Sequence, residues 1–348
     1  MKLSWIVVAF HSSPVIGPAI ESFRKEARAA GHVAEVVVID HSDDAAETAA
    51  LEALEPEHLE VRPNAGYAAG LNAGRSHATG EILLFGNPDL HFEAGSVAAL
   101  VKATGEADLV GPQFELAGFL FPPAEPRTVR EERRRQRAGR SPGAWFRTMR
   151  RETDRCRRVW EASSLIAVRQ LSGALVACRR EVAERLGPWD ESYFLYFEET
   201  DWIDRAHRLG LTVALEPRAR VVHSWGHAAR PSGQAERYAR SRRRYFRSRG
   251  WLGRLALRTP KWGEDLPFAA GELPGERRRD LGPAWWLASP TSLGMPAAGL
   301  RSHGVPLESL RALHEACPEA LSLVVSAVPD EGSAVAGVWR SDPPSGAQ

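Results

Sequence analysis

Three carboxylates stand close together in one short stretch, where Glu198, Glu199 and Asp201 follow the aromatic run YFLYF (193–197). Burial beside apolar side chains, or beside another negative charge, changes the proton affinity of a carboxylate. One of the three could therefore act as a general base, which takes a proton from a reacting hydroxyl. The same residues also suit the first turn of an ordinary helix, where acidic side chains interact favourably with the helix dipole. Both interpretations are open on this stretch alone.

The elements that would position such residues alternate between strand and helix. Short apolar runs bounded by Gly, Pro, Asn or Asp predict strands at 3–10, 34–40, 58–63, 80–86 and 107–112. Helical composition predicts helices at 16–30, 44–55, 67–78 and 94–104. This alternation predicts an α/β fold with a mainly parallel sheet covered on both faces. Ligands bind beyond the carboxyl ends of the strands in such a sheet, so residues that directly follow the strands are candidates.

Two of these strand ends carry oxygen ligands. Asp40 could accept the ring N–H of a uracil or thymine, or cap the next helix, although Asp43 and Asp44 are better placed as caps. Asn87 and Asp89 stand two residues apart in NPD, a spacing that lets both reach a diphosphate and the oxygen-preferring cations Mg²⁺ or Mn²⁺. NPD is also a common turn sequence.

A glycine-rich segment, NAGYAAGLNAG (64–74), follows the third predicted strand. Its glycines allow the backbone to approach a ligand closely. The spacing matches neither the G-x-G-x-x-G fingerprint nor a Walker P-loop, so a nicotinamide-cofactor enzyme or an ATPase loses its main support.

Composition limits the classes of function. The chain has 348 residues, of which 43% are apolar, and this suits one large domain with a smaller one. Its 45 basic and 44 acidic residues nearly cancel, so global charge does not favour nucleic acid as a partner. Cys156, Cys178 and Cys317 form no C-x-x-C pair and no disulfide framework, which favours a reducing compartment.

Two basic stretches contain aromatic residues. Residues 125–158 and 237–251 are rich in arginine, and each could be a solvated loop or helix. Alternatively, Trp145, Phe146 and Met149 could contact a phosphate-bearing lipid or an anionic membrane surface among these arginines. No apolar run approaches the roughly 20 residues that span a bilayer, so any membrane contact is expected to be peripheral.

The chain is expected to divide near two boundaries. Residues 1–228 form the predicted catalytic domain, with 125–158 as an insertion or acceptor loop. A basic amphipathic helical segment is expected at 229–258. Residues 259–348 are expected to form a small appended α/β module, with a helix at 306–316, strands at 320–328 and 333–340, and no catalytic residues.

Six segments, taken in order, resemble the inverting GT-A glycosyltransferases of family 2, especially bacterial enzymes of the rhamnosyltransferase type. They are IVVAFHS, VVVIDHSDD, NAGYAAGLNAG, LLFGNPD, LSGALVACRREVAERLGPWDESYFLYFEETD and VVHSWG, within about residues 3–250. The resemblance implies a GT-A, Rossmann-like fold and transfer of a sugar from a nucleotide-sugar donor, with dTDP-rhamnose or a UDP-sugar favoured. The acceptor would be a hydroxyl of a glycan, a glycolipid, a lipid-linked molecule or another acceptor. It also implies Mg²⁺ or Mn²⁺ as cofactor, polysaccharide biosynthesis, and a cytoplasmic place at the inner face of a bacterial membrane.

The resemblance assigns roles on the donor side. Phe10 and Asp40 would hold the nucleotide base, and the residues lining the nucleotide pocket would be Asn64, Gly66 and Asn72. Asp89 would bind the metal together with His223, which could otherwise be a half-buried strand residue. Asn87 stands where many relatives have the first aspartate of this motif.

The resemblance also assigns roles around the sugar and the acceptor. Gly173 would let the backbone pass close to the donor sugar, and Trp189 and Asp190 would shape the acceptor side. Glu199 stands where the family has its catalytic aspartate, with Glu198 and Asp201 as alternative bases.

Two other functions compete with this interpretation. A sugar-1-phosphate nucleotidyltransferase would need a glycine-rich basic loop after the first strand, and AFHSSPVIG lacks one. A non-catalytic nucleotide-sugar-binding or scaffold protein would explain why Asn87 and Glu199 replace the commoner aspartates.

Overall fold

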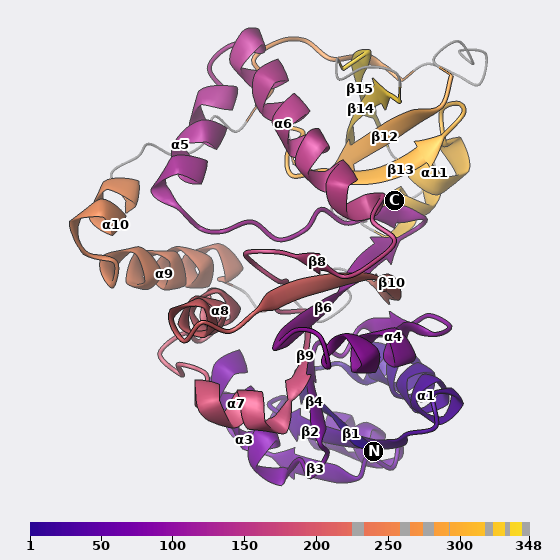
Figure 1. Ribbon diagram of the computed structural model, residues 1–348, viewed down its shortest axis with the longest axis vertical. Helices are drawn as coiled ribbons and strands as arrows, with labels where there is room; N and C mark the ends of the chain where they lie inside the picture. The colour runs from indigo at the N-terminus through magenta and orange to yellow at the C-terminus, as the bar shows by residue number, and fades with distance from the viewer. Residues whose placement is uncertain are drawn as a thin grey trace. The chain divides into compact units, whose positions relative to one another are not determined.

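A computed structural model describes residues 1–224, 233–257, 265–273, 282–291, 293–316, 323–330 and 335–342 (Figure 1). The chain folds into two compact units. The first unit contains residues 1–114, 123–126 and 162–250, and the second contains 115–122, 127–161 and 251–348. The predicted boundaries at 228/229 and 258/259 lie outside the described residues.

The first unit is built on a mixed sheet. Its strands are β1 (Lys2–Ala9), β2 (Val33–Asp40), β3 (His58–Val61), β4 (Ile82–Gly86), β5 (Leu90–Phe92), β6 (Leu109–Leu116), β8 (Ile166–Ala167), β9 (Leu175–Arg179) and β10 (Val213–His223). The order β3-β2-β1-β4-β9-β6 is parallel from β3 to β4, and β9 runs antiparallel to both of its neighbours. β10 runs antiparallel to β5 and β8 and also pairs with β6. The expected α/β fold is confirmed, although β9 and β10 make the sheet less parallel than predicted.

Helices cover this sheet, and the first three follow the parallel strands β1, β2 and β3 along the chain. They are α1 (Ser13–Ala29), α2 (Ala45–Glu52), α3 (Tyr67–His77), α4 (Ser96–Ala103), α7 (Arg180–Leu186), α8 (Glu198–Arg208) and α9 (Gln234–Arg247). Two glycines let α3 lie against the sheet. A Cβ on Gly70 would be 2.6 Å from Val8 Cγ2, and one on Gly74 would be 2.5 Å from Ile6 Cγ2. The glycines of the 64–74 segment therefore serve helix packing as well as backbone approach.

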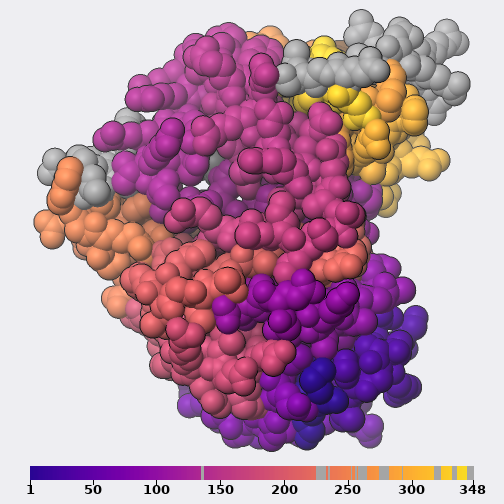
Figure 2. All heavy atoms as spheres, viewed as in Figure 1, coloured from indigo at the N-terminus to yellow at the C-terminus, as the bar shows by residue number. Residues whose placement is uncertain are grey.

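The second unit is an antiparallel sheet with a long helix across it. Its strands are β7 (Phe119–Leu120), β11 (Gly271–Glu272), β12 (Ala284–Ser289), β13 (Ala298–Ser302), β14 (Leu323–Pro329) and β15 (Gly337–Ser341), in the order β11-β15-β14-β12-β13-β7. All these neighbours pair antiparallel except β11 and β15. The helices are α5 (Val129–Ala138), α6 (Pro142–Trp160), α10 (Gly250–Leu257) and α11 (Leu307–Ala316). α6 lies beside this sheet (Figures 1 and 2), and its buried side chains share one hydrophobic core with β12 and β14.

The arginine-rich segment 125–158 is therefore largely part of the second unit instead of a loop of the first. Trp145 and Met149, which could have faced a membrane, are 0% and 1% exposed in the core of the second unit. The Trp145 indole N–H donates to Leu293 O at 2.8 Å. Phe146 is 40% exposed and stacks on Phe268. An apolar stripe on one side of α6 thus explains the aromatic residues among the arginines.

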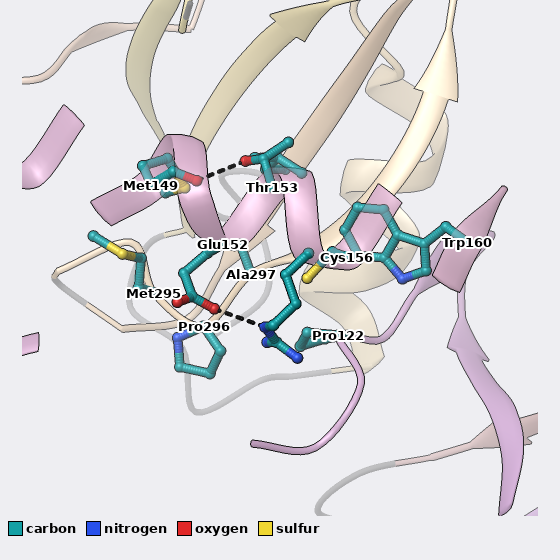
Figure 3. A pocket seen from close by; sticks show the side chains of 11 residues that line it. Pro122, Met149, Glu152, Thr153, Cys156, Trp160, Met295, Pro296 and Ala297 are labelled. Atoms are coloured by element: carbon teal, nitrogen blue, oxygen red, sulfur yellow. Dashed lines mark hydrogen bonds and ion pairs between the residues drawn. The ribbon is translucent and has the colours of Figure 1, made fainter. Parts of the chain in front are cut away.

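A small hollow lies beside α6 in the second unit (Figure 3). Its lining includes Met149, Cys156, Trp160, Met295 and Pro296. The space inside holds about one water molecule, so it is too small for a sugar nucleotide.

The described helices were also considered as membrane spans. Among the residues that the structure describes, no helix combines the length and the apolar character that crossing a bilayer demands.

Candidate active site

The parallel strands of the first unit bring several predicted residues to one edge of the sheet. Ala9 pairs with Asp40 between β1 and β2, and Val7 pairs with Gly86 between β1 and β4. Phe10, Asp40 and Asn87 therefore stand at neighbouring strand ends. This is the edge at which ligands bind in sheets of this kind.

Asp40 is fully buried and holds the loop between β2 and α2. Its Oδ1 accepts the Ser42 N–H at 2.9 Å, and its Oδ2 accepts the Thr48 hydroxyl at 2.7 Å. The cap of α2 is Asp44, as its carboxylate accepts two N–H groups of the first turn, whereas Asp43 is exposed with a positive φ. Half-buried Phe10 directly follows β1, the strand beside β2. Asp40 thus shapes the loop beside Phe10.

Gly66 lies where α3 begins beside the aromatic turn 193–197. Its φ is +101°, and a Cβ there would lie 2.5 Å from the Phe194 carbonyl oxygen. The Tyr67 N–H donates to that same oxygen at 2.7 Å. Asn64, which is exposed, accepts the Gly66 N–H at 3.1 Å. A residue with a side chain at position 66 would push the helix and the turn apart.

Asn72 holds the chain near residue 189 by its side-chain amide. Its Oδ1 accepts the Trp189 N–H at 2.8 Å, and its Nδ2 donates to Trp189 O at 3.0 Å and to Glu191 Oε1 at 2.8 Å. The structure therefore places the Asn72 amide against this segment, whereas the sequence predicted that it would line a nucleotide pocket.

The three predicted metal-site residues lie together. His223 ends β10, which pairs with β5 so that His223 is opposite Leu90. The His223 Nε2 atom is 3.3 Å from Asp89 Oδ1 and 3.3 Å from Asn87 Nδ2. Asp89 is 6% exposed, and its Oδ1 atom accepts no hydrogen bond from the part of the chain that the structure describes. A buried carboxylate oxygen without a hydrogen-bond donor, beside an imidazole nitrogen, suits a divalent cation.

Tyr67 is a residue of this site that the sequence did not single out. Its hydroxyl donates to Asn87 Oδ1 at 3.0 Å, which leaves the Asn87 NH₂ group facing His223 Nε2. His223 Nε2 also lies 3.3 Å from Asp89 Oδ1, so Tyr67 and Asn87 extend the group of contacts around the predicted metal site. Burial, and then the charges of Glu198, Asp89 and Glu199, raise the pKa of Tyr67 and keep it a donor. The signal in the sequence was a tyrosine directly after the glycine that opens α3.

A strained turn precedes the three carboxylates. Tyr196 and Phe197 are consecutive non-glycine residues with φ of 68° and 71°. Left-handed backbone is uncommon for aromatic residues and is tolerated where the surroundings fix it. Two contacts from α9 hold this turn in place. The Ser241 hydroxyl donates to Leu195 O at 2.7 Å, and the Arg237 guanidinium lies 4.9 Å from the centre of the Phe194 ring.

The carboxylates after this turn have three different environments. Burial, and then the charge of Glu199, raise the pKa of Glu198 well above its usual range. Asp201 forms an ion pair with Arg205 Nε at 3.1 Å. Glu199 is half-buried and accepts the Thr200 hydroxyl at 2.8 Å. Gly173 lies against it, because a Cβ there would be 3.0 Å from Glu199 Cβ.

The two predicted acceptor residues differ in exposure. Trp189 is 3% exposed and stacks on Trp202 with ring centres 4.3 Å apart, so its ring belongs to the core. Asp190 accepts hydrogen bonds from Ser192 and lies 3.4 Å from the Arg244 guanidinium. Burial alone would raise the pKa of Asp190, but the Ser192 hydrogen bonds and the Arg244 charge lower it. Asp190 therefore remains a charged group at the surface of this region.

Comparison with known proteins identifies part of the chain. Residues 4–157 match the family model described as Glycosyl transferase family 2. Two curated proteins from Mycobacterium tuberculosis, from strains CDC 1551 / Oshkosh and ATCC 25618 / H37Rv, each named N-acetylglucosaminyl-diphospho-decaprenol L-rhamnosyltransferase, are 29% identical over 153 residues. These residues are 42% of this chain and 48% of each relative, so the match spans about half the length of the relatives.

A solved structure supports the fold. The crystal structure of GalNAc-T7 with UDP, GalNAc and Mn²⁺ aligns with a TM-score of 0.50 and 13% identity, over 73% of this chain and 49% of that chain. This likeness supports the expected GT-A type of α/β fold. The family match contains Phe10, Asp40 and Asp89 but ends before the Glu198–Asp201 region and His223.

Proposed function

We propose that this chain, whose residues 4–157 match the family model of family 2 glycosyltransferases, transfers a sugar from a nucleotide-diphosphate donor to a hydroxyl with inversion at the anomeric carbon. The observation that carries the proposal is the position of Tyr67 between the two halves of the site. Its hydroxyl donates to Asn87 Oδ1 at 3.0 Å, and its backbone N–H donates at 2.7 Å to Phe194 O in the turn that precedes Glu198 and Glu199. A metal-site aspartate and a candidate base would thus act on one bound substrate.

The residues near Asp89 fit a divalent cation. Asp89 Oδ1 and His223 Nε2 would hold Mg²⁺ or Mn²⁺, with Asn87 beside them. The name of the solved GalNAc-T7 structure includes Mn²⁺ together with UDP, which supports this assignment. When bound, the cation would neutralise the negative charge on the departing diphosphate. Because Nε2 has one lone pair, the Asn87 NH₂ group would leave His223 when that nitrogen binds the ion, and the Tyr67 hydroxyl would hold the Asn87 amide beside the site.

Glu199 is the proposed base, because its two neighbours are engaged otherwise. The raised pKa of Glu198 favours its protonated form, and Asp201 is paired with Arg205. Glu199 would take the proton of the acceptor hydroxyl while the hydroxyl oxygen forms a bond to the anomeric carbon. The bond from that carbon to the diphosphate oxygen breaks on the opposite face, and its electron pair leaves with the nucleotide diphosphate.

The donor and acceptor are proposed from the relatives. Their printed name describes transfer of L-rhamnose to a sugar on a diphospho-decaprenol lipid, which supports dTDP-rhamnose over a UDP-sugar and a lipid-linked acceptor. Exposed arginines on α9 (Arg240, Arg243 and Arg247) follow helical spacing and would face an anionic lipid surface. The proposed place of action is therefore the inner face of a bacterial membrane, with peripheral contact.

A donor panel tests this proposal. The melting temperature is measured with Mn²⁺ and each of dTDP-rhamnose, UDP-glucose, UDP-N-acetylglucosamine and GDP-mannose, because a bound donor stabilises the folded state by mass action. We expect one donor to raise the melting temperature, with dTDP-rhamnose first, and we expect the effect to disappear in Asp89→Ala. Transfer to lipid-linked N-acetylglucosamine is then followed, and NMR of the product should show inverted anomeric configuration.

Other outcomes would favour the competing functions. A donor that binds without transfer to any acceptor in a broad panel would support a non-catalytic sugar-nucleotide-binding protein. Release of pyrophosphate from a nucleoside triphosphate and a sugar phosphate would support a nucleotidyltransferase. Retention of configuration in the product would contradict the inverting mechanism.

A further inference from the structure

A second group of metal-ligating side chains lies at the opposite end of α3 from the candidate active site. Tyr67 is the first residue of this helix and His77 is the last, with an axial length of about 15 Å between them. His77 is close to His58 and Glu60 on β3. One potential ligand atom from each of the three side chains lies within 4.8 Å of the others.

The fold places these three residues together. His58 and Glu60 are two residues apart on one strand, so their side chains project from the same face. β3 pairs with β2, where Val37 is opposite His58 and Ile39 is opposite Glu60. The bare Cα of Gly74 lets α3 lie close to the side chains of the same Val37 and Ile39. The end of α3 is thereby held beside β3.

The contacts of these side chains suit metal binding. The His58 Nε2 atom is buried and has no hydrogen-bond partner among the described residues. Glu60 Oε2 lies 2.9 Å from His77 Nε2, whereas Arg62 approaches the other oxygen, Oε1, at 3.6 Å. Oε2 is thus the oxygen directed toward His77.

We propose that His58, Glu60 and His77 form a binding site for Zn²⁺ or a similar borderline divalent cation. Two imidazoles and one carboxylate are a ligand set that Zn²⁺ accepts, with water in a fourth position, and imidazole ligands disfavour Mg²⁺. The two rings stack with centres 3.7 Å apart and planes at 19°, so both must turn to direct their nitrogens at one ion. The bound ion would fasten β3 to the end of α3. This site does not depend on the proposed glycosyl transfer.

The test measures Zn²⁺ binding by calorimetry in the full-length Asp89→Ala protein, which removes the aspartate of the other candidate metal site. We expect one Zn²⁺ per chain and a rise in melting temperature on binding. Adding His58→Gln or His77→Gln should weaken Zn²⁺ binding by about 100-fold or more. Co²⁺ should give the visible absorption of a tetrahedral complex in Asp89→Ala and lose it in either histidine variant.

His91→Gln is the matched control. His91 is an exposed histidine on β5, and its Nε2 is 4.0 Å from Oε1 of Glu93, two residues further along the chain. Among the described residues, it belongs to no group of three potential metal ligands. Its replacement should leave Zn²⁺ affinity unchanged. Absence of Zn²⁺ binding in Asp89→Ala, or equal affinity in folded His58→Gln and His77→Gln proteins confirmed by circular dichroism, would overturn the proposal.

Discussion

The donor side and the acceptor side of the candidate active site are built in different ways. On the donor side, Asn87 and Asp89 follow a buried strand and meet His223 at the end of another. On the acceptor side, Glu198 and Glu199 follow two residues with left-handed backbone, and α9 holds that turn. Regular sheet geometry positions the first group, and long-range contacts position the second. The family match covers much of the first group and none of the second.

Replacing Glu199 should impair catalysis on the acceptor side and leave donor binding intact. We expect Glu199→Gln to lower kcat by about 10²–10⁴-fold, the usual contribution of a general base. The donor-induced rise in melting temperature should remain, because the donor side is unchanged. Steady-state kinetics with dTDP-rhamnose, beside thermal shifts, check both parts.

Asp201→Asn is the matched control for this variant. Asp201 is ion-paired with Arg205, and loss of such a partly exposed pair costs about 0–1 kcal/mol. If Asp201→Asn lowered kcat as much as Glu199→Gln, the base would be assigned to the wrong carboxylate.

Gly66→Ala should break the contact between the two sides. The new Cβ would lie 2.5 Å from the Phe194 carbonyl oxygen at a φ of +101°. We expect a loss of about 3 kcal/mol in the free energy of unfolding, from backbone strain and displacement of the turn together. Urea unfolding measures it. Gly31→Ala is the matched control, because Gly31 also has a positive φ, +75°, but nothing lies within 4 Å of a Cβ placed there. It should therefore cost only the backbone strain, about 1–2 kcal/mol of unfolding free energy.

Tyr67→Phe should weaken the donor side without removing a metal ligand. The Asn87 amide would lose the hydrogen bond that orients it toward His223. Loss of such an outer partner typically lowers metal affinity by about 10- to 100-fold, which Mn²⁺ titration by electron paramagnetic resonance can follow. Tyr245→Phe also loses a buried hydroxyl contact, to Asp204 at 2.7 Å, and should leave Mn²⁺ affinity unchanged. Equal Mn²⁺ affinities in the two variants would contradict the role of Tyr67.

Glu198→Gln should change how the stability of the protein depends on pH, because Glu198 is buried whereas Glu199 is half-buried. The folded protein holds the Glu198 proton more tightly than the unfolded chain, because its pKa is raised in the folded state. Wild-type stability should therefore fall, relative to the variant, as pH rises above about 4.3, the unfolded value for glutamate. The difference should grow by about 1 kcal/mol per pH unit until the raised pKa is passed. Melting curves of both proteins from pH 4 to 8 test this, and a constant difference would contradict it.

Much of the first unit could be predicted because its signals are local. Apolar runs bounded by turn residues identified the strands, and strand ends led to Asn87 and Asp89. Distant contacts gave no such signal: the Asn72 amide bonds to Trp189, 117 residues away. Tyr67 belongs to the site only because the fold places the start of α3 beside Asn87, which follows β4. Buried apolar residues of α6 repeat at helical spacing (Trp145, Met149, Cys156 and Trp160), but the abundant arginines around them favoured exposure over the burial that the structure has.

The short strand β3 also affects how copies of this chain behave in solution. It is the last strand of its sheet and has four residues, with His58 and Glu60 on it and Arg62 just after it. An uncovered edge strand can pair with a strand of another molecule, and brevity and charge both oppose this. The open side of the first unit's sheet is thus a poor template for aggregation between chains.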